Sequence, residues 1–216
     1  MEWKLPIRSM LIMQQRAPIE GGTLMTELTK DRVPPGQTLT QGFPVLHYGD
    51  VPYYRDMSKW DLRIFGLVEE EVTLSYSEFM ALPRREFRND IHCVTTWSKL
   101  DNVWEGVAVS TLMERVKLKP EAQYVMLHAE QGWTTNLPLE DFMRETTFLG
   151  IKHNGELLTP EHGYPVRAVV PHLYFWKSAK WLRGIEFMAK DKPGFWERNG
   201  YHMYGDPWRE QRYDFD

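Results

Sequence analysis

The chain has 216 residues, of which 42% are hydrophobic and nine are tryptophan, so it is long enough to bury a substantial core. Its formal net charge is −4 with acidic and basic residues mixed, which excludes the basic block or stripe typical of nucleic-acid-binding proteins. The apolar run from Met10 to Met13 is too short for a signal peptide or a membrane span, and a single cysteine is present. These features predict a cytoplasmic protein without a membrane span or an intramolecular disulfide.

The two ends of the chain differ in character from its centre. Residues 14–58 are rich in proline, glycine and threonine, so this stretch is expected to wrap around a domain. We therefore divide the chain into an extended arm over residues 1–42, a central domain over residues 43–190 and a tail over residues 191–216. The tail carries several Trp and Tyr residues and is expected to pack on the domain, because disordered segments contain few aromatic residues.

The central domain shows short strands mixed with short helices. Strands are predicted over residues 60–68, 124–129, 166–170 and 181–188, with a hairpin over residues 148–158 that turns at Asn154-Gly155. Helices are predicted from Ser75 or Ser77 to Leu82, over residues 110–116 with Ser110 as the cap, and over residues 138–144 with Pro138 in the first turn. Because no regular βαβ alternation is present, the pattern predicts an α+β fold.

Cys93 lies in the polar stretch from Asp90 to Lys99. A lone sulfur can act as a nucleophile, as a redox sensor, or as the one protein ligand of a metal that a cofactor otherwise holds. A buried, inert thiol is the alternative, since free cysteine packs as a small hydrophobic residue. The polar surroundings argue against that alternative, and the nearby His92 and Lys99 are expected to favour the thiolate.

Two further clusters carry polar groups. Arg167, Ser178 and Lys180 lie in a cluster over residues 162–181 that contains Gly163, Pro165 and Pro171, and a guanidinium, a hydroxyl and an ammonium suit an anionic phosphate. An ordinary solvated basic turn is the alternative interpretation. His47 and Tyr48, in a loop-like region, are either hydrogen-bonding partners of a polar heterocycle or packing residues.

Residues 93–98, 106–107, 163–171 and 177–181 form four segments that occur in the same order in a known family. Together they resemble the catalytic domain of the sulfite oxidase family, whose members hold a molybdenum–pterin cofactor. The likeness extends over about residues 43–188. The cysteine segment is most similar to that of the branch formed by the catalytic subunits of bacterial protein-methionine-sulfoxide reductases.

The resemblance implies a fold of mixed β-sheets with short helices, in which residues 43–190 form the molybdopterin-binding catalytic domain. It implies molybdenum and molybdopterin as cofactors, with Cys93 as the catalytic thiolate ligand of the metal. The residues at positions that match cofactor contacts of the family are His47, Tyr48, Asn136, His162, Arg167, Ser178 and Lys180.

The resemblance also implies a molybdenum-dependent oxidoreductase that transfers an oxygen atom, with reduction of a small S- or N-oxide as the expected reaction. Sulfite oxidation is the alternative, but sulfite-oxidising relatives usually carry an arginine where this chain has Leu46, and a buried dianion needs fixed positive charge. A non-catalytic pterin-binding protein or a thiol redox sensor is the other alternative. The length leaves no room for a haem domain, so a separate electron-transfer protein is the expected partner.

Overall fold

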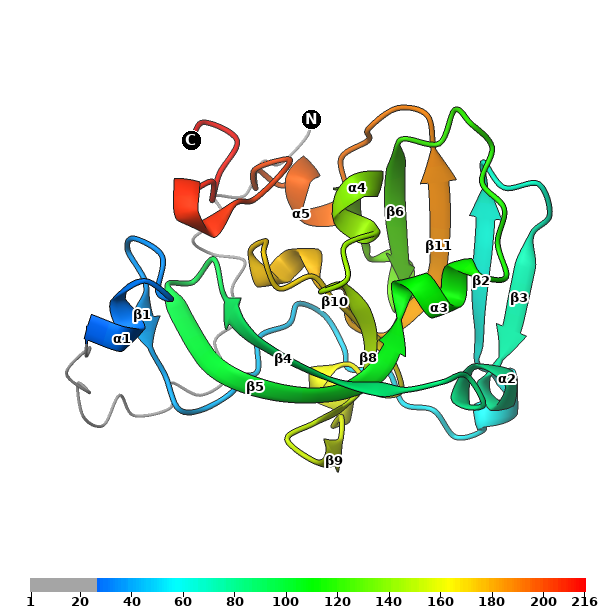
Figure 1. The fold of residues 1–216 in the computed structure, drawn as a ribbon, viewed down its shortest axis with the longest axis horizontal. Helices are drawn as coiled ribbons and strands as arrows, with labels where there is room; N and C mark the ends of the chain where they lie inside the picture. Colours follow the sequence, from blue (N-terminus) through cyan, green and yellow to red (C-terminus); the bar gives the residue numbers. More distant parts are fainter. Residues whose placement is uncertain (1–26) are drawn as a thin grey trace.

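The computed structural model describes residues 27–216 (Figure 1). Its strands are β1 (Thr38–Leu39), β2 (Asp61–Gly66), β3 (Val72–Ser75), β4 (Arg85–His92), β5 (Trp97–Ala108), β6 (Tyr124–Ala129), β7 (Thr134–Pro138), β8 (Phe148–His153), β9 (Glu156–Leu157), β10 (Arg167–Val169) and β11 (Leu182–Met188). Its α-helices are α1 (Glu27–Lys30), α2 (Tyr76–Met80), α3 (Val109–Met113), α4 (Leu139–Phe142) and α5 (Phe195–Arg198). Its 3-10 helices are η2 (Met57–Lys59), η3 (Glu130–Gly132), η4 (Pro160–His162), η5 (Phe175–Lys177) and η6 (Pro207–Arg209).

These strands form two mixed β-sheets. The first sheet has the order β1-β5-β8-β10, with β4 also paired to β5 and β9 paired to β8. The second sheet has the order β3-β2-β11-β6-β7. The pairs β1–β5 and β2–β11 are parallel and the other named pairs are antiparallel. The predicted α+β fold of mixed sheets and short helices is therefore confirmed.

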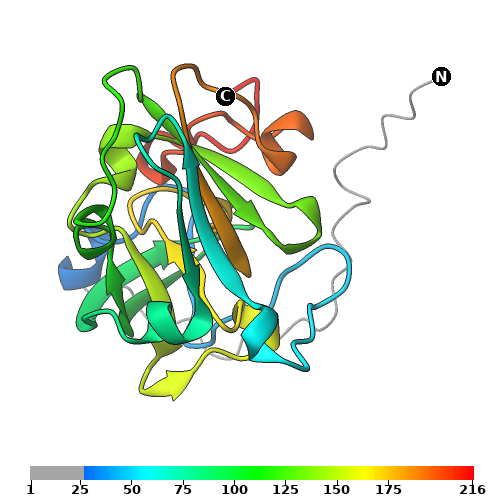
Figure 2. The same ribbon diagram turned by 90° about the vertical axis from the view of Figure 1, so that its right-hand side faces the viewer.

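A hydrophobic cluster joins the two sheets. Alternation along β2 buries Leu62 and Ile64 while Arg63 between them is exposed, as expected for a strand with one face on the core. These side chains belong to the same cluster as Ile185 of β11 and Leu149 of β8, a strand of the other sheet. Figure 2 shows β2 in cyan and β11 in orange side by side, at the centre of the second sheet. Alternation along β2 therefore places its apolar side chains in a core that both sheets share.

Most predicted elements are present. The predicted strands correspond to β2, β6, β10 and β11, and the hairpin turns at Asn154-Gly155 between β8 and β9. Ser75 caps α2 in a capping box with Glu78, in which each side chain binds the other residue's backbone N–H. The predictions from periodicity and from turn and cap residues are confirmed at these positions.

Three local predictions were wrong or incomplete. The sequence did not predict β4 and β5; the first half of β4 exposes the charged side chains of Arg85, Glu86 and Arg88, so it lacks an apolar run. Ser110 does not cap α3; the cap position is Ala108, because β5 continues directly into the helix without a loop. Pro138 ends β7 and occupies the position before α4 rather than its first turn.

The C-terminal segment packs against the domain near η5. Tyr201 is only 4% exposed, and the Tyr174 N–H donates to the Gly205 carbonyl oxygen at 2.7 Å. Trp176 fits closely on Gly205, since a Cβ there would lie 2.7 Å from the indole ring. Figure 1 shows this segment in orange and red beside α4, with α5 as its first helix. At the other end, β1 adds a short parallel strand to β5.

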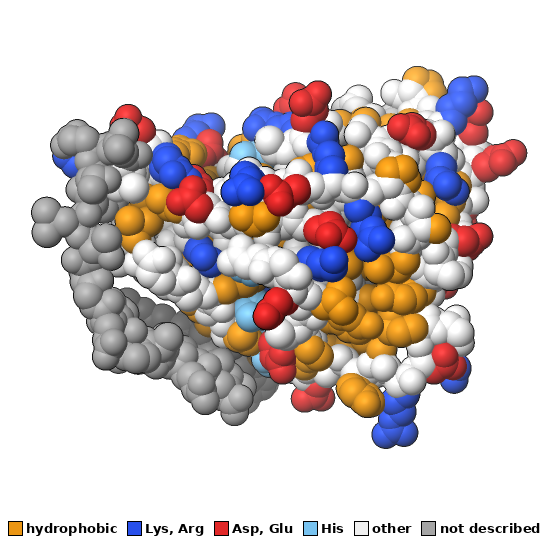
Figure 3. Space-filling model, turned by 60° about the horizontal axis from the view of Figure 1, so that its bottom comes forward, with side chains coloured by type: hydrophobic (Ala, Val, Ile, Leu, Met, Phe, Trp, Pro, Cys, Tyr) orange, Lys and Arg blue, Asp and Glu red, His pale blue; other side chains and the backbone are white. Residues whose placement is uncertain are grey.

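The surface carries both charge signs. Figure 3 shows acidic and basic side chains intermingled on one face, around an orange cluster of apolar side chains. Within residues 27–216 the helices are all too short or too polar to cross a bilayer.

Gly106 offers a test of how tightly β5 and β8 pack. A Cβ at Gly106 would collide with the carbonyl oxygen of Leu149, a backbone atom that cannot turn away. We expect Gly106→Ala to lower the free energy of unfolding by about 1–3 kcal/mol, measured by urea denaturation. Gly42→Ala is the matched control, because the atom nearest to a Cβ at Gly42 would be Thr40 Oγ1 at 3.8 Å, an ordinary contact distance. Equal stability of the two variants would contradict the described packing.

Candidate functional site

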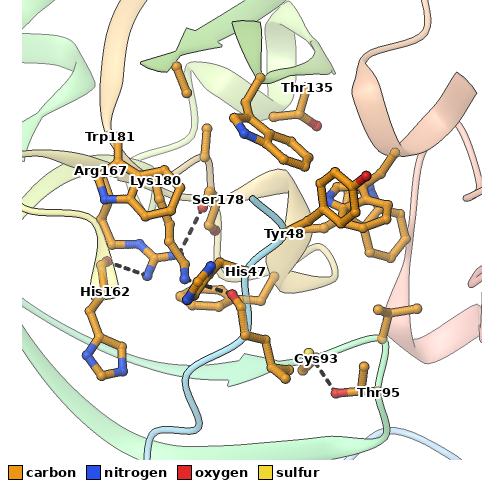
Figure 4. Close-up of a pocket in the computed structure, with 18 of the residues that line it drawn as sticks. His47, Tyr48, Cys93, Thr95, Thr135, His162, Arg167, Ser178, Lys180 and Trp181 are labelled. Atoms are coloured by element: carbon orange, nitrogen blue, oxygen red, sulfur yellow. Dashed lines mark hydrogen bonds between the residues drawn. The ribbon is translucent and has the colours of Figure 1, made fainter. Parts of the chain in front are cut away.

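A pocket opens beside Cys93 and gathers residues from distant parts of the chain (Figure 4). Its wall comes from the loop before β2, the turn after β4, the start of β7, the segment from η4 to Trp181, and the tail. Seven of the eight predicted site residues line it, namely His47, Tyr48, Cys93, His162, Arg167, Ser178 and Lys180. Asn136 is the exception, and it does not line the pocket.

Cys93 sits in a tight turn between β4 and β5. The Cys93 N–H donates to the Trp97 carbonyl oxygen at 2.8 Å, and the Thr96 N–H donates to the Cys93 carbonyl oxygen at 3.0 Å. Thr96 has a φ of 73°, the left-handed conformation that lets the chain reverse here. The turn therefore fixes the backbone of Cys93.

Two segments far away in the sequence hold this turn. Gln37 Nε2 donates to the Cys93 carbonyl oxygen at 3.1 Å from the N-terminal side of the chain. Arg212 Nη1 donates to the Val94 carbonyl oxygen at 3.0 Å from the tail. The position of the thiol therefore depends on both ends of the described chain.

The thiol itself is buried, with 8% of the Cys93 surface exposed. Burial raises the pKa of Cys93, while the Thr95 hydroxyl, 3.2 Å from the sulfur, and the charges of Lys180 and Arg212 act in the opposite direction. The free thiol is therefore protonated at neutral pH, and binding to a metal would release its proton.

The structure corrects the expectation that His92 and Lys99 favour the thiolate. Burial lowers the pKa of His92 to about 4, so that its ring is neutral at pH 7. Its Nδ1 is hydrogen-bonded to Ser98 Oγ at 2.8 Å. The cations that act on Cys93 are instead Lys180 and Arg212, which lie far away in the sequence.

Arg167 is a buried cation that has no carboxylate partner among the described residues. Only 1% of its surface is exposed, and it donates to the carbonyl oxygens of His162 and Ser178, each at 2.9 Å. Its guanidinium lies 4.3 Å from the ring centroid of Phe175, a cation–π distance. Burial lowers its pKa to about 9, so it stays charged at neutral pH. It forms no ion pair with any residue of the described range 27–216.

Lys180 adds a second positive charge next to Arg167. Its Nζ donates to the carbonyl oxygens of Leu46 at 2.7 Å and Glu161 at 2.6 Å, and the described part of the chain gives it no carboxylate within ion-pair distance. Burial, followed by the charge of Arg167, lowers the pKa of Lys180 to about 7. Two neighbouring cations without an acidic partner suit an anionic ligand. The interpretation of this cluster as an ordinary solvated turn is therefore wrong for Arg167.

Ser178 and His162 complete this end of the pocket. Ser178 Oγ accepts a hydrogen bond from the Val170 N–H at 2.8 Å, which leaves its hydroxyl hydrogen available. His162 Nε2 lies 3.0 Å from the Phe43 carbonyl oxygen and therefore donates to it. Burial lowers the pKa of His162, so the ring stays neutral. We call Arg167, Ser178 and Lys180 the cationic end of the pocket.

His47 and Tyr48 lie on the loop before β2. His47 Nδ1 is hydrogen-bonded to the Gly49 carbonyl oxygen at 3.0 Å. Tyr48 contacts the rings of Trp133 and Trp196 with centroid distances of 5.7 and 6.4 Å. Figure 4 shows Tyr48 and Lys180 on opposite sides of the pocket. The loop therefore spans from the cationic end to a second end with aromatic side chains.

Asn136 lies behind the pocket wall in a buried network. Its Oδ1 accepts from Lys177 Nζ at 2.8 Å, and its Nδ2 donates to Asp191 Oδ1 at 2.8 Å. Lys177 also donates to Glu197 Oε1 at 2.6 Å, and both side chains are about 1% exposed or less. The structure thus connects Asn136 with the tail, and its assignment as a cofactor contact stays a prediction without support from this geometry.

Several lining residues were not predicted. Four of them are aromatic and two are the threonines that precede Asn136. Only the aromatic composition of the tail gave a signal in the sequence, for Trp196 and Tyr201. These residues are Trp133, Thr134, Thr135, Trp176, Trp196 and Tyr201. Trp97, in the turn that carries Cys93, also lines the pocket.

A metal at Cys93 would need ligands beyond the protein. Within residues 27–216, no group of three or more His, Cys, Asp or Glu side chains is placed to hold a metal ion. A single thiolate therefore suits a metal whose other soft ligands come from an organic cofactor. The pocket offers such a cofactor one sulfur ligand and a cationic end for a negatively charged group.

Comparison with known proteins gives consistent matches. The family profile described as "Oxidoreductase molybdopterin binding domain" matches residues 48–196. The uncharacterized oxidoreductase YuiH of Bacillus subtilis (strain 168) is 63% identical over 185 residues, which cover 86% of this chain and 93% of that protein. The protein-methionine-sulfoxide reductase catalytic subunit MsrP of Campylobacter jejuni is 29% identical over 163 residues, or 68% of this chain.

Among solved structures, the sulfane dehydrogenase SoxCD from Paracoccus pantotrophus aligns with a TM-score of 0.63 at 22% identity. The alignment covers 72% of this chain and 43% of the SoxCD chain, and it supports the fold alone. This chain matches 54% of the length of MsrP, so a large part of that relative has no counterpart in the match.

The buried pair of Lys177 and Glu197 offers a stability test. Replacement of Lys177 by Met would leave the Glu197 carboxylate buried without its cation, and we expect a loss of about 3–5 kcal/mol in the free energy of unfolding. Lys117→Met is the matched control, because Lys117 pairs with Glu69 on the surface, with 77% and 51% of the two side chains exposed. That variant should lose about 1 kcal/mol or less, measured by urea denaturation. Similar losses in both variants would contradict the role of the buried pair.

Proposed function

Since the chain belongs to the sulfite oxidase family of molybdopterin-binding oxidoreductases, we propose that its pocket holds a molybdenum–molybdopterin cofactor and reduces an S- or N-oxide. One observation carries the proposal: the sole cysteine and two cations without carboxylate partners within residues 27–216 line the same pocket. A cysteine hydrolase would need a base at the thiol, and the ring of His92 is bonded to Ser98 instead.

The residues present fit such a cofactor. Arg167, Ser178 and Lys180 would hold its phosphate, with a guanidinium, a hydroxyl and an ammonium around one anion. Two buried polar atoms of the lining residues, Trp97 Nε1 and Thr134 Oγ1, have no hydrogen-bond partner in the described part of the chain. Buried polar groups are nearly always paired, so these atoms would suit the polar edges of a heterocycle.

Each remaining side chain of the site has a task that its chemistry permits. The cofactor, when bound, supplies the two-electron redox chemistry. Cys93 would ligate the metal as a thiolate and give up its proton on binding. Burial and the neighbouring Cys93 raise the pKa of Tyr201, so its hydroxyl stays protonated and would be able to donate a hydrogen bond to an oxygen of the substrate.

The charge distribution favours an uncharged substrate. Reduction of a sulfoxide takes up two electrons and two protons, breaks the sulfur–oxygen bond and releases water. The cations that line the pocket are at its cationic end, where the cofactor phosphate would neutralise them. Leu46 lines the pocket with an apolar side chain at the position where sulfite-oxidising relatives usually carry arginine. With Arg167 and Lys180 paired to that phosphate and Arg212 outside the pocket lining, a sulfite dianion would find no unpaired cation among the described lining residues.

The electrons would come from a separate electron-transfer protein, because residues 27–216 offer no cluster of metal-ligating side chains for a second redox centre. The location of this chain in the cytoplasm stays a prediction from the sequence.

The proposed function is tested with protein purified from a host that makes molybdopterin. We expect about one molybdenum atom per chain and two-electron reduction of methionine sulfoxide or an N-oxide with an artificial electron donor. Cys93→Ser should keep the fold and lose the reductase activity together with the sulfur signature in the electron paramagnetic resonance spectrum. Oxidation of sulfite without reduction of any oxide would instead establish sulfite dehydrogenase activity. A metal-free protein that responds only by reversible oxidation of Cys93 would establish a sensor.

Lys180 tests the cationic end separately. We expect Lys180→Met to retain about tenfold less molybdopterin, since a charged hydrogen bond to the phosphate is lost. The measurement is the pterin content after gel filtration, by fluorescence of the oxidised pterin. Arg183→Met is the control, because Arg183 pairs with Asp61 and Glu130 and does not line the pocket. Equal retention by both variants would refute an anion site at Lys180.

A further inference from the structure

We infer that the aromatic side of the pocket binds the organic group of the substrate, so that the preferred substrate is an uncharged S- or N-oxide carrying an aryl or similarly flat apolar group. This inference rests on the proposed function and specifies its substrate class. We define the aromatic wall as Trp133, Trp176, Trp196 and Tyr201, all of which line the pocket.

The four rings form a continuous surface that begins at Cys93. Tyr201 lies in one buried cluster with Cys93, and Trp176 and Trp196 pack against that cluster. The Tyr201 ring lies 5.0 Å from each of these two tryptophan rings, and Trp196 lies 5.7 Å from Trp133. A substrate whose reacting oxygen is next to Cys93 would therefore lay its remaining atoms along these rings.

The wall is assembled from three separate chain segments and remains partly open to solvent. Trp133 precedes β7, Trp176 lies in η5, and Trp196 lies in α5, and each of them is partly exposed. At its outer edge, Tyr48 is 37% exposed. Large aromatic rings that share one pocket and keep accessible surface gain free energy when a ligand covers them, and flat ligands do so best by stacking.

The wall is held rigidly before any ligand binds. Trp176 Nε1 donates to Glu197 Oε1 at 2.9 Å, and the adjacent Cζ2–Cη2 edge of its ring packs on Gly205. Trp196 and Tyr201 are stacked with an angle of 16° between their planes. A surface fixed in this way loses little conformational freedom on binding, which increases affinity for a rigid ligand.

Within residues 27–216, the aromatic wall offers no charged side chain to an ionic ligand. Glu197 directs Oε1 to Lys177, Trp176 and Thr135 behind the wall. Arg212 donates to the Val94 carbonyl oxygen and lies over the Tyr174 ring. Neither side chain lines the pocket, so a neutral organic group meets apolar rings without an unpaired charge.

The binding test uses sulfones as analogues without turnover, added to protein loaded with its cofactor. We expect methyl phenyl sulfone to bind about tenfold more tightly than dimethyl sulfone, measured by quenching of tryptophan fluorescence. Trp133→Ala should abolish this preference, whereas Trp133→Phe should keep most of it. Tyr53→Ala is the control, because Tyr53 is 80% exposed and does not line the pocket. Equal binding of both sulfones, or an unchanged preference in both Trp133→Ala and Trp196→Leu, would overturn the inference.

Two measurements distinguish a wall that binds the substrate from a wall that holds the cofactor. The molybdenum content of Trp133→Ala should equal that of the unmodified protein, and its loss would show that the wall holds the cofactor instead. In reductase assays, methyl phenyl sulfoxide should exceed dimethyl sulfoxide in kcat/KM by about tenfold. Equal kcat/KM values would overturn the substrate class and leave the reductase function in place. A sulfone preference without reduction of any oxide would refute the reductase function and support the aromatic subsite.

Discussion

The charges of Arg167 and Lys180 are the constraint on which the site depends. Both lie in the pocket without an acidic partner within residues 27–216, and each is held by backbone carbonyl oxygens that cannot neutralise it. The lowered pKa values of both groups reflect this cost of burial. An anion bound there would offset this cost and favour the charged form of Lys180, and the phosphate of molybdopterin would supply it.

The pocket separates two kinds of recognition around one sulfur atom. The cationic end suits a charged, hydrogen-bonding ligand, and the aromatic wall suits a neutral and flat one. Cys93 lies beside Tyr201 at the start of the aromatic wall and is within electrostatic reach of Lys180. This arrangement allows a cofactor and an organic substrate to meet at the thiolate without competing for the same side chains.

The tail contributes to the site as much as the strands do. It supplies Trp196 and Tyr201 to the pocket and holds the cysteine turn through Arg212. The buried pair of Glu197 and Lys177 fixes this segment on the domain and orients Trp176 at the same time. Stability of the tail and shape of the pocket are therefore coupled through one carboxylate.

Patterns in the amino-acid sequence were enough to predict the fold class and the strands β2, β6, β8, β9, β10 and β11, and the family resemblance pointed to seven residues that line the pocket. Alternation along β2 and the Asn154-Gly155 turn are local signals, so they are readable without contacts. Tertiary structure alone decided that Asn136 faces Lys177 rather than the pocket, and that Lys180 and Arg212 rather than His92 act on Cys93. The tertiary structure also brings together the side chains of the aromatic wall, which come from separate segments of the chain. Burial and the meeting of distant segments control these features, and neither leaves a periodic pattern in the sequence.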